Sequence, residues 1–268
     1  MTSRATYTTR IFSAVALLSI ALSVDSFGWP VTASLSAHAH AHRSVAAAIP
    51  DADEILNKYL DATGGSEAWK KIYSRVSQGN VIIPSMNLIG TAEMFEGAPD
   101  RALVKITVSD STFLEGFDGK IAWSSDPKQG VREQTGAQVA ETRRASDFRF
   151  PLDFRKLYPR IAAPTATTLD NRSVYVIDAI PPGSEKPDRA YFDAQTGFLV
   201  RIVTQHHNDD GTVEPFEEDF SDYRAVDGVK IPFKIHQTGA QVDFTILIKS
   251  VRQNVPLDDT RFLKPVAQ

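Results

Sequence analysis

The chain has 268 residues, a formal net charge of −4 and no cysteine. The absence of cysteine excludes disulfides, thiol nucleophiles, cysteine-based zinc or iron–sulfur sites, and lipid attachment through a lipobox cysteine. The mildly acidic balance argues against nucleic acid or anionic lipid as a partner bound by charge.

The N-terminal segment has the pattern of a secretory signal peptide. Arg4 and Arg10 form a basic region, and an apolar stretch over residues 11–24 follows it. This stretch is shorter than the roughly 20 apolar residues that a membrane-spanning helix needs. Ala37-His38-Ala39 fits a cleavage site, and residues 46–48 offer a second one. We therefore expect this segment to direct export.

The chain divides into three parts on this basis. We predict a signal peptide over residues 1–39, a linker over 40–50 and a single domain over 51–265. An uncleaved N-terminal anchor is the alternative for the first part. No other segment is long and apolar enough to span a membrane, so any membrane contact is expected to be peripheral or transient. The expected location is periplasmic or secreted.

A helix is predicted at the start of the domain. Asp51 or Asp53 can cap its N-terminus, and Gly64-Gly65 ends it. A short second helical turn is expected over residues 67–72 and carries Trp69. The apolar stripe of the first helix consists of Ile55, Leu56, Tyr59 and Leu60.

From Ser74 onward the apolar period changes from 3.6 to 2, which is typical of strands with one buried face. The clearest segment covers residues 229–236, where four apolar residues alternate with polar ones. Turn dipeptides such as Asp118-Gly119 and Asp227-Gly228 separate the strands at short intervals. The sequence therefore predicts one α+β domain built mostly of antiparallel strands.

The predicted strands, joined in sequence by tight turns, form a β-meander. A segment of helical composition over residues 136–148 interrupts it once, and a further helical turn or two is expected over residues 151–158. A helical insertion midway through a meander can plug one open end of a curved sheet. We expect it to lie on the concave face.

Three segments of the sequence resemble those of a known family. They are Phe117-Asp-Gly-Lys-Ile-Ala-Trp123, the segment Tyr191–Arg201 with its Thr-Gly turn, and the segment Phe220–Phe233 with Asp-Tyr, Asp-Gly and Pro-Phe. With the N-terminal helix and the helical insertion, they resemble the outer-membrane lipoprotein carrier and receptor superfamily (LolA/LolB-like), which includes periplasmic regulators of the MucB/RseB type.

The resemblance implies an incomplete β-barrel, a curved sheet of about eleven strands with an N-terminal helix and a helical insertion plugging the concave face. It also implies that the concave apolar face takes acyl chains or another hydrophobic ligand, or a lipidated protein. A carrier of this kind is expected to be a monomer. Arg143 and Arg144, in the insertion, are the candidates for the arginine that locks the carrier's lid.

Histidines offer the main signal for metal chemistry. His38-Ala-His-Ala-His42 has a spacing that can bind copper, nickel or zinc, but it lies beside the cleavage site. His206 or His207 could share a site with His236, although adjacent residues of a strand point to opposite faces. The carboxylates of residues 214–222 have the pattern of a solvent-facing strand rather than of a calcium loop. No metal site is predicted.

The sequence contains no G-x-S-x-G elbow, no Gly-rich phosphate loop and no dinucleotide fingerprint. No catalytic residue and no cofactor are predicted, and the protein is expected not to be an enzyme. Three functions remain open: a carrier or binder of a hydrophobic ligand, an interaction or sensor domain with the same fold and a filled core, and a metal-dependent activity through the histidines. The predicted ligand-lining residues are Met94, Val104, Ile106, Phe113, Phe233 and Phe244.

Overall fold

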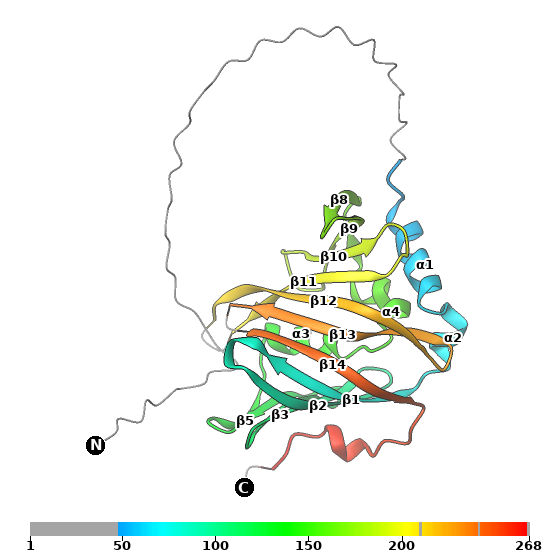
Figure 1. The fold of residues 1–268 in the computed structure, drawn as a ribbon. Helices are drawn as coiled ribbons and strands as arrows, with labels where there is room; N and C mark the ends of the chain where they lie inside the picture. Colours follow the sequence, from blue (N-terminus) through cyan, green and yellow to red (C-terminus); the bar gives the residue numbers. More distant parts are fainter. Residues whose placement is uncertain (1–47, 209–210, 241, 267–268) are drawn as a thin grey trace, which may run out of the picture.

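The computed structural model describes residues 48–208, 211–240 and 242–266. The predicted signal peptide, most of the predicted linker and the histidine tract at residues 38–42 lie outside this part of the chain. Within the described residues, fourteen strands form one antiparallel sheet in which consecutive strands are mostly neighbours. The sheet is strongly curved, and two helices lie on its concave side (Figure 1).

The order of strands across the sheet is β6-β5-β4-β3-β2-β1-β14-β13-β12-β11-β10-β9-β7, and β8 also pairs with β9. The strands are β1 (Ser74–Ile83), β2 (Leu88–Gly97), β3 (Arg101–Val108), β4 (Ser111–Phe117), β5 (Ala122–Asp126), β6 (Gly130–Glu133), β7 (Arg160–Ile161), β8 (Thr165–Leu169), β9 (Arg172–Ile180), β10 (Asp188–Asp193), β11 (Leu199–His207), β12 (Val213–Val226), β13 (Val229–Gly239) and β14 (Val242–Gln253). The helices are α1 (Ala52–Ala62), α2 (Ser66–Lys70), α3 (Ala137–Ala145) and α4 (Phe150–Leu157), with 3-10 turns η1 (Pro84–Met86) and η2 (Asp259–Phe262).

The first helix begins and ends where the sequence places its signals. Asp51 and Glu54 form a capping box, in which the Glu54 N–H donates to Asp51 Oδ1 at 2.9 Å and the Asp51 N–H donates to Glu54 Oε2 at 3.1 Å. Gly64 and Gly65 follow its end with positive φ angles. Trp69 of α2 is buried, and its Nε1 donates to Thr63 Oγ1 at 3.1 Å. The two helices are thereby fixed to each other.

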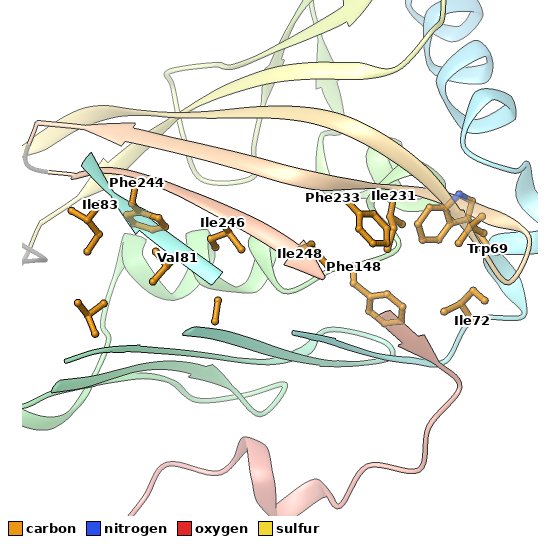
Figure 2. Packing of buried hydrophobic residues seen from close by; sticks show 13 residues of the cluster. Trp69, Ile72, Val81, Ile83, Phe148, Ile231, Phe233, Phe244, Ile246 and Ile248 are labelled. Atoms are coloured by element: carbon orange, nitrogen blue, oxygen red, sulfur yellow. The ribbon is translucent and has the colours of Figure 1, made fainter. Parts of the chain in front are cut away.

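The alternating apolar residues of the middle strands form a buried cluster, here called the central core. Figure 2 shows its side chains between β13 and β14 on one side and β2 on the other. Phe148, from the link between α3 and α4, packs into it. The buried members are Trp69, Ile72, Val81, Ile83, Ala92, Val108, Phe148, Val229, Ile231, Phe233, Phe244, Ile246 and Ile248.

A second buried cluster joins α1 and α4 to the strands β9, β10 and β11. It is rich in aromatic rings, and Phe154 lies 4.9 Å from Tyr158 and 6.1 Å from Phe192 between ring centroids. Its buried members are Ile55, Leu56, Tyr59, Phe154, Tyr158, Ile177, Ala179, Ala190, Phe192 and Leu199. Both helices are therefore held on the sheet by apolar contacts.

The outer face of strands β3 and β5 is covered by the C-terminal segment. Phe262, in η2, is fully buried against Leu103 and Trp123, and Trp123 Nε1 donates to the Phe262 carbonyl at 2.8 Å. This segment protects apolar residues on the convex side of the sheet.

The predicted α+β fold, an incomplete barrel with a helical insertion on the concave face, is confirmed. The sheet has more strands than the eleven that the resemblance implies. Short strands such as β6, β7 and β8 have four, two and five residues, too few to show an alternating pattern. None of the helices in the described ranges is long and apolar enough to cross a membrane.

Candidate functional site: the concave face and helix α3

Helix α3 lies across the concave face and bridges the two halves of the curved sheet. It contacts β5 on one side and β11 on the other. Only Thr142 of its nine residues is buried, whereas α4 inserts Phe154 into the aromatic cluster. Its N-cap, Gly136, provides no side-chain hydrogen bond. Helix α3 is therefore held mainly by polar contacts rather than by its own apolar packing.

On the side of β3 to β6, two residues of α3 make polar contacts. The Thr142 hydroxyl donates to Gln134 Oε1 and lies 3.3 Å from Glu115 Oε1. Arg143 Nε lies 3.5 Å from Asp100 Oδ2, and the guanidinium stands 5.7 Å from the centroid of the buried Phe117 ring.

On the side of β10, Arg144 makes a buried contact. Its Nη2 lies 3.5 Å from Asp188 Oδ2, and the side chains of Arg144 and Asp188 are 14% and 3% exposed. The Tyr158 hydroxyl donates to the same Asp188 oxygen at 2.8 Å. Burial raises the pKa of the Asp188 carboxyl, although Arg144 and Tyr158 act to lower it. Asp188 is thus a carboxylate in an apolar wall, balanced by a cation from α3.

The end of β11 is joined to α3 through Glu141. Its carboxylate pairs with His207 Nδ1 and lies 3.5 Å from His206 Nδ1. Gln138 Nε2 donates to the His207 carbonyl at 3.0 Å. Adjacent strand residues are expected on opposite faces, yet both rings reach Glu141 because α3 lies over the end of β11.

These contacts shift the pKa values of the Glu141 carboxyl and the His206 imidazole in opposite directions. Burial acts to raise the pKa of Glu141, but hydrogen bonds from His206 and His207 outweigh burial and lower it below 4.5. The hydrogen bond to Glu141 raises the pKa of His206 above 6.5, against the effect of burial. Glu141 and His206 are therefore both mainly charged between about pH 4.5 and pH 6.5.

This cluster predicts a pH-dependent stability contribution. The His206 part is present below pH 6.5 and is lost as the pH rises through its raised pKa; the Glu141 part is present above pH 4.5 and is lost as the pH falls through its lowered pKa. Glu141→Gln should therefore lower Tm more at pH 5.5 than at pH 8.5. Because His206 is 43% exposed, we expect roughly 1 kcal/mol or less.

The measurement is thermal unfolding of the wild type and Glu141→Gln at both pH values. The control repeats the comparison in a protein that carries both His206→Gln and His207→Gln. In that protein the Tm difference caused by Glu141→Gln should no longer depend on pH. Equal Tm differences at pH 5.5 and pH 8.5 in the native background would contradict the assignment.

The predicted ligand-lining residues occupy neighbouring strands around the central core. Phe233 and Phe244 are buried in it, at 7% and 6% exposure, while Met94 and Ile106 are half-buried and pack against it. The other two residues are their cross-strand partners. Val104 of β3 is paired with Met94 of β2, and Phe113 of β4 is paired with Ile106 of β3.

Asp188 and Tyr158 were not expected from the sequence. The available signal is the phase of β10, in which Asp188 falls on the same face as the buried Ala190 and Phe192. A carboxylate on the same buried strand face as apolar residues must itself be buried, and it therefore needs a hydrogen-bonding or charged partner inside the fold.

The structure does not bring the three strand histidines together. His206 and His207 contact Glu141, whereas His236 Nε2 lies 2.9 Å from Asp243 Oδ1. Across residues 48–208, 211–240 and 242–266, no group of three or more histidine, aspartate or glutamate side chains is arranged to hold a metal ion.

A half-open surface hollow of about 460 Å³ lies between the turns that follow β8 and β10. Its lining is mostly polar and comes from neither α3 nor the central core. The lining residues are Asn171, Arg172, Ser173, Asp193, Ala194 and Gln195.

Comparison with known proteins rests on structure, since no family model and no curated protein sequence matches the chain. LolA superfamily protein NE2245 from Nitrosomonas europaea is 12% identical, with 81% of this chain and 99% of that chain covered and a TM-score of 0.52. A DUF1329 family protein from Desulfovibrio piger is 11% identical, with 79% and 96% covered and a TM-score of 0.51.

The MucA/MucB complex of Pseudomonas aeruginosa also matches, at 12% identity over 78% of this chain and 61% of that chain, but its TM-score of 0.21 is too low to carry an argument. At these identities the likenesses concern the fold alone. The resemblance to LolA/LolB-like proteins is confirmed at that level: the chain is similar in fold to a LolA superfamily protein.

Proposed function

We propose that this protein is an exported binding or carrier protein whose ligand, a hydrophobic molecule or the lipid part of a lipidated protein, occupies the concave face when α3 is displaced. The observation that carries the proposal is the contrast between the apolar floor and its cover. The floor is the central core, and α3 covers the concave face with one buried side chain and a set of polar contacts.

Helix α3 can move away from the concave face without loss of the apolar contacts of the central core. Apart from the buried contact of Arg144 with Asp188, the polar contacts of α3 lie at the surface and exchange with water at little net free energy, whereas the apolar contacts of α4 would have to be replaced. Displacement of α3 would widen access to the half-buried Met94 and Ile106. The protein is proposed to act as a monomer in the periplasm or outside the cell, with transient membrane contact, no nucleic-acid partner and no catalytic role.

A second function is supported by Phe148. Its side chain, 5% exposed, fills the central core from the concave side, so the floor is already covered at that point. This favours an interaction or sensor domain in which a protein partner, rather than a small ligand, meets the surface formed by α3.

The two functions are separated by purifying the protein from the periplasm without detergent and measuring its native mass. A co-purifying lipid or acylated peptide, recovered by organic extraction, is expected for the carrier. A clean mass, together with no uptake of a neutral apolar fluorescent probe, would favour the interaction domain.

Substitution on the concave face provides a sharper test. Ile106→Gln should weaken uptake of a neutral apolar probe such as 1-N-phenylnaphthylamine by about tenfold, because a ligand on the floor would contact this half-buried side chain. Ile89→Gln is the matched control, since Ile89 is 69% exposed and outside the floor. Equal affinities of the two variants would contradict a ligand on the concave face.

A further inference from the structure

Two adjacent arginines of α3 reach opposite walls of the concave face. Arg144 extends to β10, where it meets the buried Asp188. Arg143 extends to the other wall, where it meets Asp100, donates to the Gly119 carbonyl at 3.4 Å and stands over the Phe117 ring. Carboxylates, carbonyl oxygens and aromatic faces are the groups that bind organic cations in proteins. Both walls therefore present cation-binding groups to α3.

The contact at Asp188 differs from a surface ion pair. Both side chains are largely removed from water, and the Asp188 carboxylate is fixed by the Tyr158 hydroxyl. Tyr158 is itself fixed by the rings of Phe154 and Phe150. A carboxylate prearranged in this way is destabilised when its cation is withdrawn, because the charge stays buried with hydrogen bonds but no opposite charge beside it.

This has a consequence for any ligand that displaces α3. When α3 leaves the concave face, Arg144 leaves Asp188 with it. The displacement costs least when another cation reaches the same carboxylate. With a neutral amphiphile, Asp188 would have to stay charged without a cation or take up a proton, and an anionic one such as a fatty acid would place a second negative charge beside it.

We propose, on the basis of the proposed function, that the ligand is an amphipathic cation, with an alkyl or acyl body on the central core and a primary amine or guanidinium that replaces Arg144 at Asp188. A second positive charge on the ligand would take the place of Arg143 beside Asp100 and Phe117. Arg144 acts in the closed form as an internal substitute for the ligand's charged group.

The experiment is competition for the neutral probe 1-N-phenylnaphthylamine at pH 7 by three amphiphiles of equal chain length: dodecylamine, dodecanol and dodecanoate. The expected result is that dodecylamine displaces the probe at a concentration about tenfold or more below that of dodecanol, with dodecanoate weakest, as for one desolvated charge-assisted contact. In Asp188→Asn the ratio of dodecylamine to dodecanol should fall to near one.

The matched control is Asp178→Asn, which removes a carboxylate that pairs with Arg189 across β9 and β10 and is 33% exposed; the ratio should stay as in the wild type. Arg144→Gln is a second variant, and it should bind dodecylamine more tightly because the competing cation is gone. Its Tm should rise with dodecylamine more than the wild-type Tm does.

Each outcome has one meaning. Probe uptake with equal displacement by dodecylamine and dodecanol, or a ratio that survives Asp188→Asn, would overturn the cationic ligand and leave the proposed function standing. A complete lack of probe uptake by the wild type would overturn the proposed function, and this inference with it.

Discussion

Ile246→Asp is expected to abolish folding of the domain. Ile246 is 4% exposed in the central core and lies opposite Val81 on β1 and Ile235 on β13. The substitution removes the packing of a buried isoleucine, worth about 2–5 kcal/mol, and adds a buried charge that costs several kcal/mol more. Domains of this kind are stable by about 5–15 kcal/mol, so little or no stability should remain.

The measurement is denaturant unfolding followed by tryptophan fluorescence. Thr245→Asp is the matched control, because the neighbouring residue of β14 points to the opposite face of the sheet and is only half-buried. A cooperative unfolding transition of Ile246→Asp at the wild-type midpoint would contradict the assignment of this strand and of the core it faces.

Phe262→Ala is expected to lower the free energy of unfolding by about 3–5 kcal/mol, which corresponds to a fall in Tm of about 10 °C. Phe262 is fully buried against Leu103 and Trp123, and its ring leaves a cavity when it is removed. The hydrogen bond that the indole Nε1 of Trp123 donates to residue 262 can remain, since its acceptor is the backbone carbonyl.

Leu263→Ala is the adjacent control, since Leu263 is 51% exposed and its loss should change the free energy of unfolding by less than about 0.5 kcal/mol. Similar Tm values of the two variants would show that the C-terminal segment does not cover the outer face of the sheet in solution.

The sequence predicted those elements whose pattern is local and repeated. Alternation between Val229 and Ile235 gives β13 its buried face, and Asp51 with Glu54 gives α1 its first turn. The interruption at residues 136–148 predicted α3 because its composition is helical while the flanking segments alternate. These signals depend on a few neighbouring residues, and tertiary contacts did not override them.

The candidate site was predicted less completely, for a physical reason. Strand periodicity tells which side chains share a face, but a filled core and a ligand cavity have the same alternation. Phe233 and Phe244 are packed in the central core, and whether they also meet a ligand stays a prediction. The contact of Arg144 with Asp188 joins residues 44 positions apart through the placement of a helix, which no local pattern specifies.

The order of strands also bears on how the chain reaches its final form. β1 and β14 are partners in the middle of the sheet, and Tyr73 donates to Asn254 across 181 positions. Until the last strand has emerged, β1 lacks one of its two hydrogen-bonding neighbours, and Val81 lacks its cross-strand partner Ile246. Such long-range closure is slow compared with the hairpins on either side. A chain that crosses a membrane from its N-terminus would therefore leave β1 without this partner until β14 has also crossed.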